Sequence, residues 1–138
     1  GDLTRTVVRG AAPPRLAAMY RAVKAAQAAV LAAVRPGASG ADLHARAAQI
    51  LKEHGFEDRT RHGAAEGFIH STGHGVGLAI HERPRLSPTG SILKPGHVVT
   101  VEPGLYYRAI GGVRIEDTVE VTPTGCAPLA VCPAYFEL

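Results

Sequence analysis

The chain of 138 residues is long enough for one domain, and its 46% hydrophobic and 20% charged residues are ordinary for a soluble globular protein. No apolar run reaches the roughly 20 residues that a membrane span requires, because Arg21, Lys24 and Gln27 interrupt the Ala-rich stretch 17–34. The net charge of +3 comes from basic residues spread along the chain without interleaved aromatic residues, which argues against a nucleic-acid partner.

The first elements that the sequence predicts are a strand and a long helix. Residues 1–8 alternate like a strand that begins abruptly, so we expect the native N-terminus to be missing. From Arg15 onward, apolar residues recur with the period of an amphipathic helix of about five turns, which Pro36-Gly37 ends. The apolar residues of this helix are Leu16, Met19, Tyr20, Val23, Val30, Leu31 and Val34.

A second helix is predicted after Ser39, which can cap it, with Asp42 three residues later as in a capping box; Gly55 ends it. Its expected buried stripe consists of Leu43, Ala47, Ile50, Leu51 and His54. Beyond Gly55, β-rich runs at 67–71, 97–102 and 113–121 alternate with Pro- and Gly-containing turns. This order predicts an α+β fold in which two helices pack on one face of a curved antiparallel sheet.

One histidine-rich, glycine-rich segment carries the first sign of chemistry. We interpret His44, His54, His62 and His97 as ordinary surface or core residues. In an extended chain, His70, Thr72 and His74 would face the same way, and the glycines around His74 leave open space beside its imidazole. His81 follows a bend and can return to the same cavity. The spacing favours a functional site over a structural glycine-rich turn.

Two glutamates strengthen that interpretation. Glu102 ends an apolar run, and Glu116 lies among β-branched residues with Arg114 two positions earlier on the same face. Burying an acid there is costly unless it is paired or bound to a cation. A surface pair of Glu116 with Arg114 is the plainer alternative, but both acids together with the histidines favour an Mn²⁺, Co²⁺ or Zn²⁺ site. Cys126 and Cys132 lack metal-binding spacing, so we expect packing residues in a reduced, cytoplasmic protein.

Four motifs in this order and spacing resemble the pita-bread metallopeptidases, the family of methionine aminopeptidase, Xaa-Pro aminopeptidase and prolidase. The motifs are the segments Asp2–Thr6, His70–Pro84, Val101–Tyr106 and Gly112–Asp117. The resemblance covers essentially the whole chain. It implies that residues 1–138 are the C-terminal half of a pita-bread catalytic domain, without the upstream half or the additional N-terminal domain.

The resemblance also implies a set of metal ligands. In the family, two Asp, one His and two Glu hold two divalent ions, and Asp2, His74, Glu102 and Glu116 match four of the five ligands. The first aspartate would lie upstream of Gly1. Asp2 and Glu116 would bridge both ions, whereas His74 and Glu102 would serve one. We therefore expect at most one well-held ion in this chain, with Mn²⁺ as first choice and Co²⁺ or Zn²⁺ as alternatives.

The activity that the resemblance implies is hydrolysis of peptides with proline in the second position, by a metal-activated water. Glu102 would shuttle the proton, and His70 and His81 would position the substrate and stabilise the tetrahedral intermediate. Arg114 would support a metal-bound carboxylate. The position of His70 and the residues around Glu116 resemble the proline-specific members rather than methionine aminopeptidase.

Three hypotheses stay open on the sequence alone. The parent protein is an Xaa-Pro aminopeptidase or dipeptidase, this chain is a metal-competent but inactive fragment of such an enzyme, or it is a pseudoenzyme that binds peptides or proteins without metal. Retention of four ligands argues against the pseudoenzyme. Half of a pita-bread fold should also expose surface that its other half would cover, so we expect a homo-oligomer or poor solubility.

Overall fold

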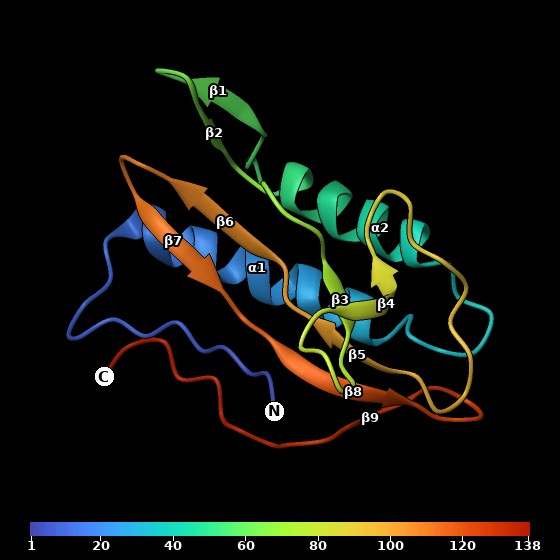
Figure 1. Ribbon diagram of the computed structural model, residues 1–138. Helices are drawn as coiled ribbons and strands as arrows, with labels where there is room; N and C mark the ends of the chain where they lie inside the picture. The colour runs from blue at the N-terminus through green and yellow to red at the C-terminus, as the bar shows by residue number, and fades with distance from the viewer.

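In the computed structural model, which describes residues 1–138, two helices lie together against a five-stranded antiparallel sheet (Figure 1). The predicted α+β architecture is therefore confirmed. Two smaller two-stranded sheets complete the fold. Neither helix combines the length and the apolar character that a bilayer span requires.

Helix α1 (Pro14–Leu31) and helix α2 (Gly40–Glu53) lie where the sequence predicts them. The Ser39 hydroxyl accepts a hydrogen bond from the Asp42 N–H at 3.3 Å, so the predicted N-cap is confirmed. The expected burial of His54 is wrong. This residue lies at the C-cap, and its exposed ring bonds back to the Ile50 carbonyl of its own helix at 2.8 Å.

The strands of the main sheet run in the order β4-β3-β5-β8-β9. Their bounds are Glu82–Leu86 (β4), Gly73–Gly75 (β3), Val98–Val101 (β5), Asp117–Val121 (β8) and Cys126–Pro128 (β9). The smaller sheets pair Arg59–Arg61 (β1) with Ala64–Glu66 (β2), and Gly104–Tyr107 (β6) with Gly111–Arg114 (β7).

Two of the three predicted β-rich runs differ from the observed strands. The run 97–102 is confirmed as β5, whereas 67–71 holds only an isolated bridge from Gly67 to Tyr106. The run 113–121 is divided into β7 and β8 by Ile115 and Glu116. The division has a physical reason, because Glu116 exchanges its backbone hydrogen bonds with Thr4 instead of with a neighbouring strand.

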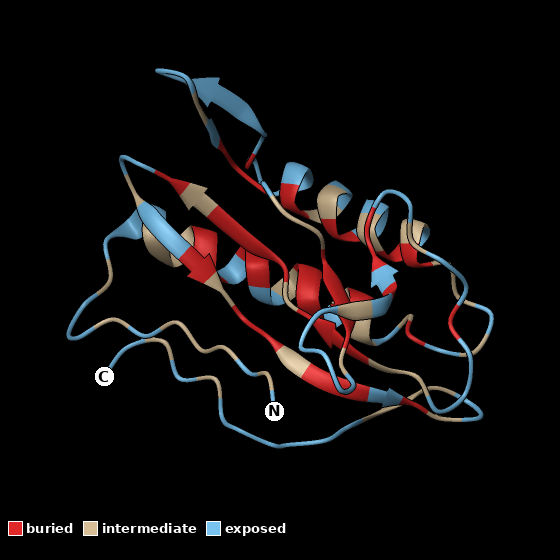
Figure 2. Ribbon diagram, in the orientation of Figure 1, coloured by how far each residue is buried: buried red, intermediate tan, exposed pale blue.

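The core lies between the helices and the sheet, where Figure 2 shows the buried faces turned toward each other. The fully buried residues of this core include Met19 and Val23 of α1 and Val99 and Val101 of β5. Burial of their apolar side chains stabilises the packing of the helices on the sheet. The buried polar exception on α1 is Gln27, whose amide donates to Asp117 Oδ2 at 2.9 Å.

The N-terminal segment is extended, as expected, but it is not part of a regular strand. It runs antiparallel beside the β7–β8 junction, bridged by Thr4 and Glu116, and lies next to the C-terminal segment, bridged by Val8 and Glu137 (Figure 1). The Arg5 guanidinium donates to the Glu116 carbonyl at 2.7 Å and pairs with Asp117 at 2.6 Å. These side-chain bonds replace a strand ladder and fix the segment that carries Asp2.

Candidate metal centre

Strand β3 places His74 at the centre of the site. The His74 side chain is buried, and the His74 backbone N–H donates to Thr100 Oγ1 of the neighbouring β5 at 3.0 Å. The strands approach so closely that a Cβ on Gly73 would lie 1.9 Å from the Thr100 carbonyl oxygen. His74 Nδ1 lies 3.1 Å from the Gly75 carbonyl, which can only accept. Nδ1 therefore donates to this carbonyl, and in the tautomer with its one proton on Nδ1 the Nε2 lone pair can bind a cation.

Three carboxylates surround this Nε2 atom. It lies 3.1 Å from Glu102 Oε1 and 3.7 Å from Asp2 Oδ2. Ligand atoms of Asp2, His74 and Glu116 all lie within 4.8 Å of one another. Glu102 does not belong to that three-residue set but lies directly beside it, held by a hydrogen bond from Thr100 Oγ1 at 3.1 Å. The four predicted ligands therefore converge from four separate segments of the chain.

Glu116 is the most deeply buried of the three acids, with 2% of its surface exposed. Burial raises the pKa of Glu116, and the nearby charges of Glu102 and Asp2 raise it further. A hydrogen bond from the Thr4 hydroxyl and the charge of Arg114 act in the opposite direction. The balance shows that the buried carboxylate lacks sufficient positive charge around it.

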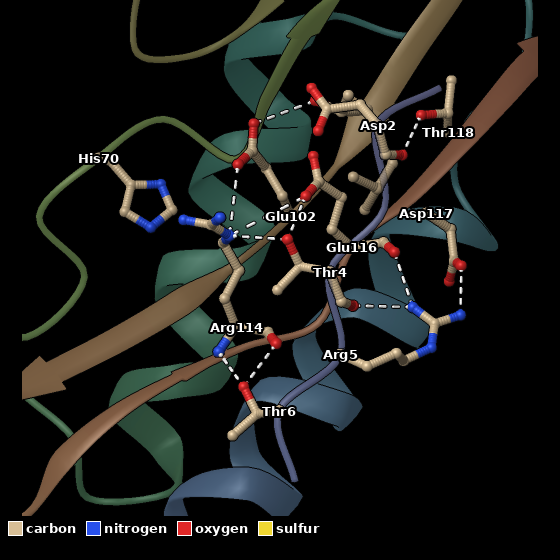
Figure 3. Close-up of polar contacts among 12 residues, drawn as sticks. Asp2, Thr4, Arg5, Thr6, His70, Glu102, Arg114, Glu116, Asp117 and Thr118 are labelled. Atoms are coloured by element: carbon tan, nitrogen blue, oxygen red, sulfur yellow. Dashed lines mark hydrogen bonds and ion pairs between the residues drawn. The ribbon is translucent and has the colours of Figure 1, made fainter. Parts of the chain in front are cut away.

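Arg114 lies between His70 and the acids Glu102 and Glu116 (Figure 3). Its Nε lies 3.9 Å from Glu102 Oε2 and 4.0 Å from Glu116 Oε2, and it donates to Thr4 Oγ1 at 3.2 Å. Its Nη1 donates to the Tyr106 hydroxyl at 3.4 Å. The plainer alternative, an isolated surface pair of Arg114 with Glu116, is therefore wrong, because Arg114 is part of a larger network in which Glu116 is buried.

The two further histidines that the sequence singled out lie beside the same network. His70 Nδ1 donates to the Ser71 carbonyl at 2.7 Å, and its Nε2 lies 3.1 Å from the Tyr106 hydroxyl. The exposed His81 ring is edge-on to His74, with 4.3 Å between ring centroids. Both histidines are therefore within reach of a molecule that approaches the acids.

Sequence reasoning missed several polar residues that support the site. Thr72, expected to face the cavity with His70 and His74, uses its hydroxyl differently: Oγ1 lies 2.9 Å from Nδ1 of His44 on α2. Thr4 and Tyr106 lie inside the motifs, but nothing in the sequence assigns a role to their hydroxyl groups. Hydroxyl groups lack a diagnostic spacing, so only the tertiary structure reveals their partners.

The donor set fits a divalent cation. Asp2, Glu102 and Glu116 gather three acids around one imidazole, whereas Arg114 is the one guanidinium paired with them. Carboxylate oxygens with a single imidazole suit hard or borderline metals, and the set contains no thiolate. A cation would relieve both the mutual repulsion of the acids and the burial cost of Glu116.

Comparison with known proteins agrees with this chemistry. A family model described as metallopeptidase family M24 matches residues 1–123. The Xaa-Pro dipeptidase of Pyrococcus furiosus is 44% identical over 129 residues, which are 93% of this chain and 35% of the relative. The chain thus spans about a third of the length of the curated relatives that it matches.

Solved structures extend the agreement to the fold. An Xaa-Pro dipeptidase from Bacillus anthracis matches with a TM-score of 0.89 and 38% identity, over 100% of this chain and 37% of that chain. An X-Pro aminopeptidase from Thermotoga maritima matches with a TM-score of 0.86 and 33% identity, over 100% of this chain and 38% of that chain. The predicted pita-bread fold is confirmed, and the chain belongs to metallopeptidase family M24.

Proposed function

We propose that this chain provides most of the metal centre of an exopeptidase that hydrolyses peptides with proline in the second position, an Xaa-Pro dipeptidase or aminopeptidase. The observation that carries the proposal is that ligand atoms of Asp2, His74 and Glu116 lie within 4.8 Å of one another, with the His74 imidazole buried. Because the chain covers 35% of its P. furiosus relative, we propose that residues 1–138 are part of a larger catalytic domain.

The proposed metal ligands are Asp2, His74, Glu102 and Glu116. The oxygen-rich donor set favours Mn²⁺, with Co²⁺ or Zn²⁺ as alternatives, and the complete enzyme would hold two ions. A divalent cation, when bound, supplies a positive charge for the developing oxyanion and lowers the pKa of a bound water. One ion would be held well by the four ligands present here, and a second would depend on a further carboxylate.

The proposed catalytic roles follow from the contacts of each side chain. Glu102 is the proton acceptor, because Thr100 orients its Oε1 at 3.1 Å and Arg114 lies near its Oε2. Arg114 fixes the direction of the carboxylates of Glu102 and Glu116, because its Nε lies 3.9 and 4.0 Å from their oxygens. His70 and His81, at the open side of the acids, would bind the peptide and stabilise the tetrahedral intermediate.

The proposed partners are a peptide with an Xaa-Pro N-terminus and a second copy of the protein, in the cytoplasm. Leu78 and Ile80 support association because both are exposed in the loop that precedes His81, at 110% and 61%. The alternative that the sequence leaves open, metal or peptide binding without hydrolysis, is tested beside it.

The test compares the complete parent protein with the isolated 138 residues, both supplied with Mn²⁺. We expect the parent to hydrolyse an Xaa-Pro dipeptide or an Xaa-Pro-initiated tripeptide and to leave the matched Xaa-Ala peptide largely intact. The His74→Ala variant should lose this activity. Absence of Xaa-Pro hydrolysis by the metal-loaded parent would overturn the proposal, and full activity of the isolated chain would exclude the binding-only alternative.

A further inference from the structure

A histidine of helix α2 contacts Thr72, the residue midway between His70 and His74. His44 follows the buried Leu43, and its Nδ1 lies 2.9 Å from the hydroxyl oxygen of Thr72. Thr72 is 0% exposed, so its hydroxyl has no access to water. A buried hydroxyl is costly to leave without a partner, and His44 is the side chain that provides one.

Thr72 connects the parts of the candidate metal centre. Its N–H donates to the Leu86 carbonyl at 2.9 Å, and its own carbonyl accepts from the Glu102 N–H at 2.8 Å. It also lies two positions from both His70 and His74. A displacement of Thr72 would therefore be transmitted to the proposed metal ligands His74 and Glu102, and also to His70.

A second route from His44 to His70 passes through aromatic rings. The rings of His44 and Phe68 have centroids 5.1 Å apart, and Phe68 meets the His70 ring edge-on at 5.5 Å. Phe68 is itself fixed, because its N–H donates to Asp58 Oδ1 at 2.6 Å. His44 thus supports both the backbone and the ring contacts that orient His70.

The surroundings of His44 favour the uncharged form of its imidazole. Burial lowers the pKa of His44, the neighbouring His70 lowers it further, and Asp58 raises it by a smaller amount. A neutral His44 can bond to the Thr72 hydroxyl without placing a positive charge beside His70.

We propose that His44 is a positioning residue that holds His70 in the tautomer with its proton on Nδ1, through the Thr72 hydroxyl and the Phe68 ring. In that tautomer, Nδ1–H donates to Ser71 and Nε2 accepts from Tyr106. The inference rests on the proposed function, in which His70 binds the peptide. The proposal adds His44, a residue of helix α2 outside the motifs, to the residues that position His70.

The direct test observes the His70 imidazole by nitrogen–proton NMR correlation in this chain. Wild-type His70 should give the signals of the Nδ1–H form. His44→Leu retains bulk against Phe68 but removes the hydrogen bond, and it should shift the His70 signals away from that form. His44→Asn, which can still bond to Thr72, should restore them. The matched control His54→Leu, at the exposed end of the same helix, should leave them unchanged.

Steady-state kinetics of the parent enzyme separate positioning from general stability. His44→Leu should raise KM for an Xaa-Pro peptide about tenfold and change kcat much less, because binding through His70 is affected more than the proton transfer. Unchanged His70 signals in a folded His44→Leu protein would overturn the inference. If that variant does not fold, Thr72→Val replaces it, with the same two outcomes.

The NMR readout needs neither metal nor hydrolysis, so the two proposals fail separately. A shifted His70 signal together with an inactive wild-type parent would remove the peptidase function and leave the positioning role. An active parent with unshifted His70 signals would remove the positioning role alone.

Discussion

Thr4 and Glu116 form a reciprocal bridge between the N-terminal segment and the β7–β8 junction. The Glu116 N–H donates to the Thr4 carbonyl at 3.0 Å, the Thr4 N–H donates to the Glu116 carbonyl at 3.4 Å, and the Thr4 hydroxyl donates to the Glu116 carboxylate. The bridge sets the position of Asp2, two residues earlier, relative to His74. Two proposed ligands from opposite ends of the chain are thus fixed by one contact.

Replacing Thr4 tests the bridge. Thr4→Val removes hydrogen bonds to the Glu116 carboxylate and from Arg114. We expect the free energy of unfolding to fall by about 2 kcal/mol, since a buried charged acceptor loses a donor. Urea denaturation measures this change, and Thr60→Val on the exposed strand β1 is the control. A Thr4→Val protein as stable as that control would show that the bridge contributes little.

Glu116→Gln should have opposite effects on stability and on metal binding. The raised pKa of Glu116 means that the folded state binds its proton more readily than the unfolded state. Ionised Glu116 therefore destabilises the metal-free protein, increasingly as pH rises above the unfolded-state pKa of this carboxyl.

At pH 7 we expect metal-free Glu116→Gln to be about 1 kcal/mol more stable than the wild type. The advantage should shrink as pH falls and Glu116 becomes protonated in the wild type. Stabilisation by added Mn²⁺ should be lost in the variant. Thermal unfolding over a pH series, with and without metal, measures both effects. A metal-free variant less stable than the wild type at pH 7 would contradict the claim that ionised Glu116 destabilises the metal-free protein.

Arg5 should contribute to folding by fixing the N-terminal segment. Its guanidinium pairs with Asp117 at 2.6 Å, with the two side chains 14% and 18% exposed, and also bonds to the Cys132 carbonyl at 2.8 Å. Arg5→Met leaves Asp117 without its cation, so we expect a loss of about 3 kcal/mol. Arg9→Met, at a nearby exposed position, should change stability little. Equal stability of the two variants would contradict this role.

Gly73→Ala should disrupt the site by forcing β3 away from β5. The added Cβ would lie 1.9 Å from the Thr100 carbonyl oxygen, which is backbone and has little freedom to move. We expect a loss of about 3 kcal/mol and weaker metal binding, because His74 follows directly. At Gly125, an added Cβ meets nothing within 4 Å, so Gly125→Ala is the matched control in calorimetry.

The sequence allowed both helices and the convergence of the ligands to be predicted because their signals are local or depend on motif order. The Ser39 cap with Asp42, and the histidine and glutamate motifs, are of this kind. The break between β7 and β8 was missed, since it depends on Thr4, more than a hundred residues away in sequence. The interpretation of His44 as an ordinary residue is incomplete for the same reason, because its partner Thr72 lies 28 residues away in sequence, just before strand β3.

Metal titration of this chain by isothermal calorimetry tests the central claim most directly. The account predicts one Mn²⁺ bound per chain with micromolar or tighter affinity, proton release that increases the affinity as pH rises, and loss of binding in His74→Ala and Glu116→Gln. His97→Ala, outside the site, should bind as the wild type does. Absence of binding to Mn²⁺, Co²⁺ and Zn²⁺ alike, or binding that survives both ligand substitutions, would contradict the metal centre.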